Sequence, residues 1–442
     1  MTDRLGHAYF RIYRAVSRVV QPAAGLIVKN RLKAGKEDPD RYREKLGQSG
    51  LERPAGVLIW VHAASVGETN AILPMLSHLQ ETGARVLLTT GTLTSASIAK
   101  TRMPHGAMHQ FMPFDFPKFV ERFLDFWKPD LAIFVESEIW PNTIFSLRKR
   151  KVPIVQINGR MSDRSFTRWQ KIPAFSRAVF GAITLCMARG KEDSDRFIAL
   201  GVSGVSITGN LKFDVPPPEV NREQLEYLRG LIGSRPVWLA ASTHPGEEDM
   251  VVDVHRMMLA RMPDLLTIIV PRHPGRGAEI RTGLGVRAQA LALRSEGAVP
   301  DEACSIYCAD TLGELGLFYS LCSVAFLGGS LIEHGGQNPI EAARLGCAVI
   351  HGPHTQNFRE IYDNLNKSGA AEKVLSRGDL HRAVQNLLSD PNKVHLRKER
   401  ALETLQPFSG ALDRSLMAMQ PLLKPIAIDA ALNGAHYHGH HP

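Results

Sequence analysis

The sequence predicts an α/β protein with two domains, each built on a doubly wound parallel β-sheet. Short apolar runs of strand length alternate with helical patterns along most of the chain. The alternation pauses once, at residues 209–221, where GNLKFDVPPPEVN contains three consecutive prolines that forbid regular helix. At 442 residues the chain is also too long for one ordinary hydrophobic core. We therefore expect two facing Rossmann-like domains that bind ligands in a cleft where the carboxyl ends of their strands meet.

The first expected domain spans residues 51–208, the second spans residues 222–420, and residues 209–221 link them. Apolar runs predict strands of the first domain at 57–61, 85–89, 131–135, 154–157 and 183–187. Strands of the second domain are expected at 237–241, 266–270, 324–327 and 348–350.

The last residues, 421–442, are rich in Ala, Gly and His, and we predict a flexible tail there. The tail contains His436, His438, His440 and His441. These side chains could chelate a metal, but disorder accounts for such a composition more simply.

Residues 1–50 differ from the rest of the chain. From Tyr9 onward apolar residues recur at near-helical spacing, and Arg11, Arg14 and Arg18 lie among them. Arginines make a membrane-spanning helix costly, and a cleavable apolar signal core is absent. We expect a basic amphipathic helix in the headgroup layer of a membrane. The same stripe would also suit packing against the protein's own first domain.

The composition favours an anionic partner and a reducing compartment. The net charge is +9 and the isoelectric point is near 9.3, which suits nucleic acid, anionic lipid or a nucleotide-linked acid. Five cysteines, an odd number in mostly apolar contexts, indicate buried thiols in the cytoplasm. Cys304 and Cys308 have no second ligand pair, so we expect no metal.

Polar groups follow two expected strands of the first domain. Ser65, Gly67 and Glu68 follow the strand at 57–61, and Glu136 and Glu138 follow the strand at 131–135. A carboxylate at the ligand-facing edge of a sheet can act as a general base toward a hydroxyl. Near a helix start, however, Glu68 could equally be a capping residue, and the other two carboxylates could be solvated charges.

Glycines in the second domain follow the expected strand at 324–327. Gly328, Gly329 and Ser330 end this strand with free backbone N–H groups, and a further glycine pair includes Gly336. A helix is then expected to begin at Asn338, where the positive end of its dipole would bind a phosphate. An ordinary strand, turn and helix with glycines for tight packing has the same pattern.

Further groups in the second domain could bind the same ligand. Glu341 lies just inside the helix and could accept hydrogen bonds from a ribose diol. Ser242 and Thr243 follow another strand and open a second candidate phosphate nest. Arg272 and His273 follow the next strand, where the guanidinium could neutralise a phosphate. Together these groups predict a nucleotide site in the second domain.

Several segments together resemble a known family, the 3-deoxy-D-manno-octulosonic acid (Kdo) transferases of Gram-negative bacteria. They are VHAASVGE, FVESEIWPN, GNLKFD, RHPGR and FLGGSLIEHGGQNPIEAARLGCAVIHGPHTQNF. The resemblance runs through both halves in the expected order, from about Arg41 (RYREKLG) to about Gly369.

The resemblance implies a GT-B glycosyltransferase that moves Kdo from CMP-Kdo to a lipid A precursor, without a cofactor. Glu68, from SVGE, would be the catalytic base that deprotonates a glucosamine 6-hydroxyl while CMP leaves with inversion. Glu138 would match an acidic position on the acceptor side. The CMP side would contain Arg272, Gly328, Gly329, Ser330, Asn338 and Glu341.

The amino-terminal segment departs from the family's pattern. Many relatives have a continuous apolar anchor there, whereas this chain carries Arg11, Arg14 and Arg18. We therefore expect peripheral or monotopic attachment to the cytoplasmic face of the inner membrane. The expected partners are CMP-Kdo, the lipid A precursor and the membrane surface, and nucleic acid is not expected.

Two other functions suit parts of the same sequence. A nucleotide-sugar epimerase or hydrolase could use the same two-domain scaffold, because a fold alone does not determine a reaction. A non-catalytic membrane or nucleic-acid binder would explain the net charge of +9. Preference for CMP over UDP would distinguish the transferase from the epimerase.

Overall fold

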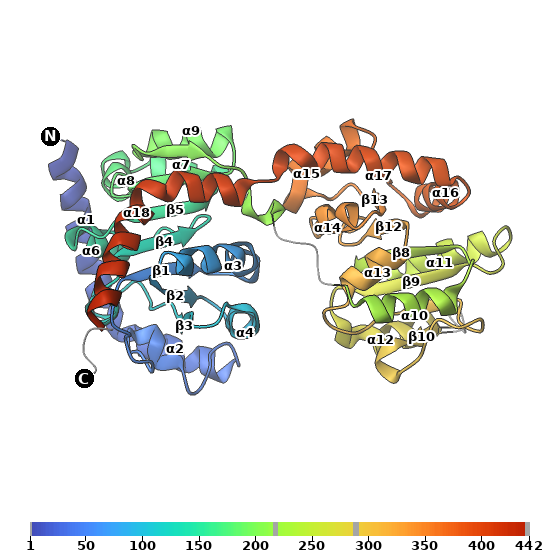
Figure 1. Ribbon diagram of the computed structural model, residues 1–442, viewed down its shortest axis with the longest axis horizontal. Coiled ribbons are helices and arrows are strands. Elements are labelled where there is room, and N and C mark those ends of the chain that lie inside the picture. Colours follow the sequence, from blue (N-terminus) through green and yellow to red (C-terminus); the bar gives the residue numbers. More distant parts are fainter. Residues whose placement is uncertain (1, 215–219, 286–290, 438–442) are drawn as a thin grey trace. The chain divides into compact units, whose positions relative to one another are not determined.

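The computed structural model describes residues 2–214, 220–285 and 291–437 (Figure 1). The chain divides into two compact units. The first comprises Met1–Val215 and Phe408–Pro442, and the second comprises Pro216–Pro407. The first unit is therefore discontinuous in sequence, because the chain returns to it after completing the second unit.

The first unit contains a seven-stranded parallel sheet in the order β3-β2-β1-β4-β5-β6-β7. The strands are β1 (Leu58–Ala63), β2 (Arg85–Thr90), β3 (Met108–Phe111), β4 (Leu131–Val135), β5 (Ile154–Gly159), β6 (Leu185–Ala188) and β7 (Val205–Ile207). The helices are α1 (Thr2–Val20), α2 (Ala24–Lys33), α3 (Val66–Glu81), α4 (Leu93–Arg102), α5 (Pro117–Trp127), α6 (Pro141–Lys149), α7 (Asp163–Gln170), α8 (Pro173–Phe180), α9 (Lys191–Leu200) and α18 (Ala411–Tyr437). Short 3₁₀ turns are η1 (Gln21–Ala23), η2 (Tyr42–Leu46) and η3 (Leu211–Phe213).

Alternate residues of β1 point into two hydrophobic cores, one on each face of the sheet. Ile59 and Val61 pack in the core that α3 and α18 cover. Leu58 and Trp60 pack in the opposite core, against α5, α6, α8 and α9. A strand buried on both faces reads as a continuous apolar run, which is why this strand was predictable.

The second unit has a parallel sheet of the same size in the order β10-β11-β9-β8-β12-β13-β14. The strands are β8 (Val237–Thr243), β9 (Leu266–Pro271), β10 (Leu291–Leu293), β11 (Ile306–Cys308), β12 (Val324–Leu327), β13 (Ala348–His351) and β14 (Ala371–Lys373). The helices are α10 (Arg222–Ile232), α11 (Glu247–Leu259), α12 (Gly277–Leu284), α13 (Leu315–Leu321), α14 (Pro339–Arg344), α15 (Arg359–Lys367), α16 (Arg377–Leu388) and α17 (Pro391–Leu405).

The predicted fold class is confirmed, and each strand predicted from an apolar run overlaps an observed strand. The prediction missed β3, β7, β10, β11 and β14. Four of these form the edges of their sheets, and all are three or four residues long. Four of the five are only three residues long, and the fifth, β3, contains His109 and Gln110, so none of them produces an apolar run of strand length in the sequence.

The amino-terminal segment forms α1, and this helix packs on the first unit with only one side. The ring of Phe10 stacks on Phe145 with centroids 3.7 Å apart, and the Tyr13 hydroxyl donates to Asp115 at 3.3 Å. The side chains of Ile12 and Val16 are 60% and 57% exposed. No described helix is both long enough and apolar enough to cross a bilayer.

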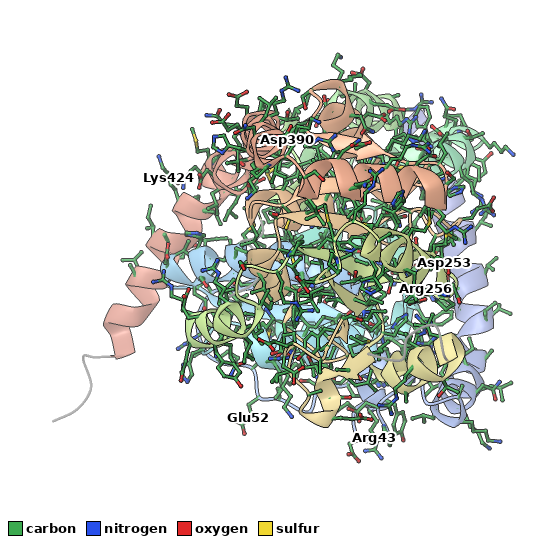
Figure 2. The ribbon with its side chains drawn as sticks, turned by 90° about the vertical axis from the view of Figure 1, so that its right-hand side faces the viewer. Arg43, Glu52, Asp253, Arg256, Asp390 and Lys424 are labelled. Carbon is green, nitrogen blue, oxygen red and sulfur yellow. The ribbon has the colours of Figure 1, made fainter. Side chains whose placement is uncertain are left out.

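The predicted flexible tail is wrong for residues 421–437, which continue α18. Met419, Leu423 and Ile426 of this helix are buried in the first unit. Lys424 of the same helix is exposed (Figure 2). The second unit therefore ends at Pro407 rather than at residue 420. Pro421 lies inside the helix and is exposed, and such prolines obscure a helical pattern in a sequence.

The predicted linker is also shorter than expected. Residues 209–214 belong to the first unit, where Leu211 and Phe213 are buried. The prolines at 216–218 lie outside the described residues, and so do His438, His440 and His441.

Candidate active site

In the first unit the candidate residues lie at the switch point of the sheet. Strands β1 and β4 are neighbours in the sheet, although β2 and β3 come between them in the chain. The connections after β1 and β4 therefore leave in opposite directions, and open α/β sheets bind ligands at such points. Glu68 follows β1, and Glu136 and Glu138 follow β4.

Glu68 lies in the first turn of α3 and exchanges hydrogen bonds with Ser65, the N-cap residue of this helix. The Ser65 hydroxyl donates to one carboxylate oxygen at 2.8 Å, and the amide of Ala64 donates to the other at 2.8 Å. The amide of Glu68 donates back to Ser65 Oγ at 3.4 Å. A carboxylate can accept about four hydrogen bonds, so this arrangement leaves capacity for a substrate hydroxyl.

The environment of Glu68 favours proton acceptance. The side chain is only 7% exposed, and burial raises the pKa of its carboxyl. The bonds from Ser65 and Ala64 oppose this rise, whereas the charges of Glu136 and Glu138 add to it. A carboxylate with a raised pKa is a stronger base than an exposed one.

Glu136 pairs with Lys212, a residue that our sequence analysis did not select as a site residue. Lys212 Nζ lies 2.5 Å from Glu136 Oε1. A side chain at Gly67 would approach this ammonium, since an added Cβ would lie 3.5 Å from it. The backbone of Glu136 has φ +59°, a left-handed conformation that is uncommon outside glycine. Because its ammonium is close to Gly67, Lys212 lies over the start of α3. The GNLKFD motif was the feature of the sequence that could have indicated Lys212 as a site residue.

Glu138 is the more accessible carboxylate of this group. Its side chain is 20% exposed and accepts a hydrogen bond from Trp140 Nε1 at 2.9 Å. His62 Nε2 lies 3.6 Å from the same carboxylate, just beyond hydrogen-bond distance. Ser65, Gly67, Glu68, Glu136 and Glu138 thus lie on two adjacent loops of one sheet edge, as predicted from their positions after strands.

The second unit has the equivalent switch point between β8 and β12. There a buried carboxylate occupies the turn that we expected to bind a phosphate. Glu247 accepts hydrogen bonds from the amides of Gly329 at 2.7 Å, Ser330 at 3.1 Å and Leu331 at 3.1 Å. It also accepts one from the amide of His244 at 3.0 Å. The prediction that the amides of Gly329 and Ser330 are free for a phosphate is therefore wrong, because an internal anion satisfies them.

Four other predicted donor-site groups are also used internally. Gly328 donates its amide to Ala241, and Gly336 donates its amide to Gly329. Ser330 is fully buried, and its hydroxyl donates to Leu327 and accepts from the amide of Gly352. Thr243 is fully buried and donates to Glu248, which pairs with Arg276. Ser242 is 9% exposed and has φ +55°. The sequence could not reveal that the polar groups of Gly328, Gly336, Ser330 and Thr243 have partners within the protein.

Arg272 and His273 are exposed near these loops. Within the described part of the chain the Arg272 guanidinium has no hydrogen bond or ion pair. The ring of His244 lies 3.9 Å from that of His334, between centroids, and its Nε2 lies 3.1 Å from the amide nitrogen of Gln337. Burial, followed by the charges of His334, His273 and the two arginines, lowers the pKa of His244 to about 4. Among the described residues of these loops, Arg272 is thus a cationic group that is available to an anionic ligand.

Asn338 caps α14, as predicted, and also contacts Glu341. Its Oδ1 accepts from the amide of Ile340 at 3.1 Å, and its Nδ2 donates to Glu341 Oε1 at 3.2 Å. Gly336 precedes this cap with φ +76°, and an added Cβ would lie 2.9 Å from the carbonyl oxygen of His354. Glycine is therefore required at this position.

The described residues contain no cluster of three or more His, Cys, Asp or Glu side chains arranged to hold a metal ion. The cysteines Cys186, Cys304, Cys308, Cys322 and Cys347 are free and buried. Burial raises the pKa of Cys304 to about 11, so this thiol is protonated at neutral pH.

Comparison with solved structures supports the fold. The chain is similar to a glycosyltransferase from Rickettsia africae, with a TM-score of 0.56 and 12% identity over 84% of this chain and 100% of that one. It is also similar to the UDP-GlcNAc 2-epimerase of Neisseria meningitidis, with a TM-score of 0.55 and 13% identity over 83% and 100%. At these identities the likeness concerns the fold alone, and it confirms the GT-B type.

Comparison of sequences identifies the family. Residues 40–215 match the family model described as 3-deoxy-D-manno-octulosonic-acid transferase (kdotransferase). The chain is 36% identical over 397 residues to the 3-deoxy-D-manno-octulosonic acid transferase of Haemophilus influenzae, covering 87% of this chain and 92% of that protein. The match extends through both units, so it includes both switch points. This chain therefore belongs to the Kdo transferase family of glycosyltransferases.

Proposed function

We propose that this protein transfers Kdo from CMP-Kdo to the 6-hydroxyl of a glucosamine in a lipid A precursor, with inversion at the anomeric carbon. The observation that carries the proposal is Glu68, a buried carboxylate with a raised pKa and spare acceptor capacity at the switch point of the first unit. The family membership supports the transfer of Kdo, and the carboxylate supports activation of a hydroxyl.

In the proposed reaction Glu68 acts as the general base. Its carboxylate takes the proton of the acceptor hydroxyl, and the hydroxyl oxygen forms a bond to the anomeric carbon of Kdo. The bond from that carbon to the phosphate oxygen breaks, and CMP leaves with the electron pair. Attack opposite the leaving group accounts for inversion.

The acceptor would bind around the same loops of the first unit. Glu138 is partly exposed and can accept hydrogen bonds from sugar hydroxyls. Ser65 and Gly67 would line the approach to Glu68. Glu136 would act together with Lys212, whose ammonium is held at the start of α3 and can interact with an anionic substrate.

The donor would bind at the switch point of the second unit, with its phosphate on Arg272 rather than on the amides of Gly329 and Ser330. The guanidinium is exposed and can stabilise negative charge that develops on the departing phosphate. His273 would assist at the same position. Asn338 and Glu341, which already contact each other, would bind the ribose. The reaction as proposed needs no cofactor.

The likeness to a UDP-GlcNAc 2-epimerase supports a second candidate, a nucleotide-sugar epimerase or hydrolase. The two candidates differ in nucleotide preference. Binding of CMP and UDP to the purified protein, measured by calorimetry, would separate them. Tighter binding of CMP supports the transferase, and tighter binding of UDP supports the epimerase.

We further propose that the protein attaches peripherally to the cytoplasmic face of the inner membrane. The acceptor is a lipid in this proposal, and α1 exposes apolar side chains such as Ile12 and Val16 beside exposed arginines. A helix with this distribution suits the headgroup layer. Nucleic acid has no role in this proposal. Absence of DNA binding at both low and high salt would agree with it.

The proposed reaction is tested by mixing the protein with CMP-Kdo and a lipid A precursor and measuring the mass of added sugar. Replacing Glu68 with Gln should reduce turnover by roughly 10²- to 10⁴-fold, the range of general base catalysis. CMP binding should survive, because Gln also serves in a capping box and α3 should remain intact.

The control is Glu81→Gln, the same substitution at the exposed last turn of α3, where the side chain is 70% exposed. Its turnover should equal that of the unmodified protein. Near-normal transfer by the Glu68→Gln variant would remove Glu68 from the role of base.

A further inference from the structure

The carboxyl end of β1 carries a histidine among apolar residues. The strand is Leu58–Ala63, and His62 within it is 1% exposed. In the sheet register His62 lies beside Thr89 of β2 and Phe134 of β4. Its ring meets the ring of Phe134 edge to face, with centroids 6.1 Å apart. A polar ring buried at this depth is expected to have a hydrogen-bond partner for each of its two nitrogens.

One ring nitrogen has such a partner. Nδ1 of His62 lies 3.1 Å from the carbonyl oxygen of Thr89 and 3.0 Å from the hydroxyl oxygen of the same residue. A carbonyl oxygen has no hydrogen to donate, and the Thr89 hydroxyl donates its own to the carbonyl of Val61 at 3.3 Å. Nδ1 is therefore the donor and carries a hydrogen.

The other ring nitrogen has no hydrogen bond. Nε2 of His62 is buried without a hydrogen-bond partner among the described residues, and it lies 3.6 Å from Oε2 of Glu138. This separation is within the limit of about 4 Å for an ion pair. If Nε2 carried no hydrogen, its lone pair would face the lone pairs of the carboxylate, and two acceptors would repel each other. A hydrogen on Nε2 removes this conflict and makes the ring a cation.

The charges at this sheet edge favour a cation at His62. Three carboxylates lie there, and the charges of Glu136 and Glu138 both act on Glu68. Lys212 pairs with Glu136. In the part of the chain that the structure describes, Glu138 has no ion pair apart from the contact with His62. A positive imidazole ring therefore gives Glu138 a partner of opposite charge.

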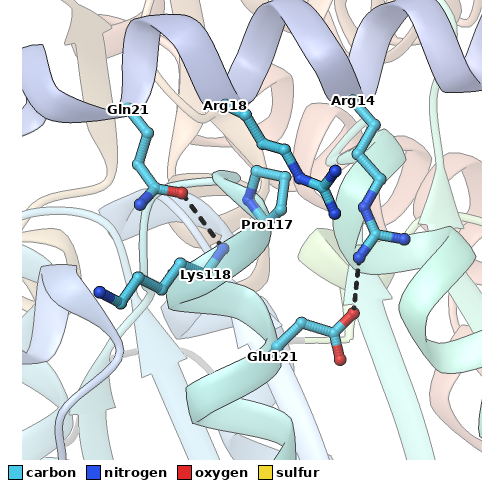
Figure 3. Close-up of a pocket in the computed structure, with 6 residues that line it drawn as sticks. All are labelled: Arg14, Arg18, Gln21, Pro117, Lys118 and Glu121. Carbon is cyan, nitrogen blue, oxygen red and sulfur yellow. Dashed lines mark hydrogen bonds and ion pairs between the residues drawn. The ribbon is translucent and has the colours of Figure 1, made fainter.

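A second buried nitrogen without a hydrogen bond, Nε of Arg14 in α1, provides a contrast. The Arg14 guanidinium pairs with Glu121 of α5 through Nη2 at 3.3 Å (Figure 3). An arginine nitrogen is a donor in every state, so no change of protonation is involved there. The unpartnered nitrogen of His62, by contrast, is either a donor or an acceptor, and the neighbouring carboxylate selects the donor.

We propose that His62 is a positioning residue: it carries a hydrogen on each ring nitrogen and holds Glu138, through Nε2, in the orientation that binds the acceptor sugar. Trp140 Nε1 donates to the same carboxylate oxygen, Oε2, at 2.9 Å. His62 and Trp140 together fix this oxygen, and Oε1 remains to accept a hydrogen from a sugar hydroxyl. The ring of His62 is buried, so it acts through Glu138 and does not contact the substrate itself. The inference rests on the proposed acceptor role of Glu138.

Two substitutions separate the two ring nitrogens. The side-chain amide of Asn reaches about as far as Nδ1, and that of Gln reaches about as far as Nε2. His62→Asn therefore keeps a donor beside Thr89 and loses the contact with Glu138, whereas His62→Gln keeps a donor beside Glu138. Kdo transfer is measured while the acceptor and the donor are varied in turn. His62→Asn should raise the KM for the acceptor roughly 10-fold, the effect of one charge-assisted hydrogen bond, without a matching change in kcat or in the KM for the donor. His62→Gln should recover most of this loss.

A double variant tests whether His62 acts through Glu138. In a Glu138→Gln background, His62→Asn should change the KM for the acceptor by less than about twofold, because the charged partner is already removed. A rise as large as in the unmodified background would overturn the inference, and so would a normal KM in the single His62→Asn variant. The control is His78→Asn, which removes an exposed histidine of α3 that lies 3.2 Å from Glu81. Its kinetics should equal those of the unmodified protein.

The hydrogen on Nε2 has a test that does not depend on activity. Nitrogen NMR of the full-length protein with isotope-labelled histidine distinguishes a ring with hydrogens on both nitrogens from a neutral ring. The His62 signals are identified by their absence from the spectrum of His62→Gln or His62→Asn. Two protonated nitrogens are expected at neutral pH. A ring with a hydrogen on Nδ1 alone would overturn the inference.

The kinetics also separate this inference from the proposed function. A normal KM for the acceptor in Glu138→Gln would contradict the proposed acceptor role of Glu138. A raised KM in Glu138→Gln together with a normal KM in His62→Asn would contradict only the inference about His62.

Discussion

At the scale of single residues, one carboxylate can serve both the fold and the chemistry. Glu68 accepts hydrogen bonds from Ser65 and Ala64, and these bonds hold the first turn of α3. The same bonds fix the rotamer of the carboxylate, which reduces the reorganisation that proton transfer requires. The capping role and the proposed catalytic role are therefore compatible, and the two alternatives left open by the sequence do not exclude each other.

The raised pKa of Glu68 predicts how transfer depends on pH. A general base must be ionised, so kcat should fall as the pH decreases through the pKa of Glu68, which burial places above its ordinary value. The charge of Glu138 contributes to this rise. The Glu138→Gln variant should therefore have a lower Glu68 pKa, and the acidic limb of its kcat profile should move to lower pH.

The measurement is the pH profile of kcat for both proteins at saturating substrates. Glu81→Gln, whose site lies at the far end of α3, serves as the control and should leave the limb in place. An acidic limb at the same pH in Glu138→Gln would show that Glu138 does not act on the base.

Glu247 supports a second prediction at this scale. Its four amide donors need both carboxylate oxygens as acceptors. In Glu247→Gln one oxygen becomes an NH₂ group, so two buried amides lose their acceptor. Each unsatisfied buried donor costs roughly 1–3 kcal/mol, so the variant should lose about 2–6 kcal/mol of stability.

Urea unfolding would measure the change, and CMP binding should weaken with it because His244 and Gly329 lose their shared anchor. The control is Glu279→Gln in the same unit, where the side chain is 67% exposed. Unchanged stability in Glu247→Gln would mean that the amides find other acceptors.

At the scale of elements, α18 is the helix that closes the first unit. Its buried residues Met419, Leu423 and Ile426 complete the core between the sheet and α3. Leu423→Ala should reduce stability by about 2–5 kcal/mol, as for other buried leucines. Leu432→Ala, at a position 60% exposed on the same helix, should change it by less than about 0.5 kcal/mol.

Urea unfolding of both variants tests the role of this helix. A Leu423→Ala variant as stable as the unmodified protein would indicate that α18 does not contribute to the core. A similar loss in Leu432→Ala would mean that the exposed side of the helix is also packed.

At the scale of the whole molecule, the two units share one sheet architecture but carry different candidate residues. Each has a seven-stranded parallel sheet with one switch point, and each switch point carries the candidate residues of one substrate. In the proposed reaction the first would offer carboxylates to the acceptor, and the second would offer Arg272 to the donor. A net charge of +9 suits a protein whose proposed substrates and membrane surface are all anionic.

The discontinuous first unit explains why the predicted domain boundaries were only partly correct. The chain enters the second unit after residue 215 and returns at Phe408. Residues 209–214 and 408–432 have local patterns that could belong to either unit. Their assignment depends on contacts such as those of Asp214, which accepts hydrogen bonds from the amides of Gly410 and Leu412.

The sequence alone determined the α/β class, the strands with apolar runs, the family, and the position of Glu68 at a helix start, because these depend on patterns between neighbours in the chain. Residues 131–135 illustrate this. A strand buried on both faces has a continuous apolar sequence, and the predicted run has the same bounds as β4. Only the tertiary structure showed that Glu247 fills the turn at Gly329, that Lys212 pairs with Glu136, and that α18 completes the first core. Each of these contacts joins residues tens to hundreds of positions apart, and the local sequence does not record which distant group satisfies a buried charge or amide.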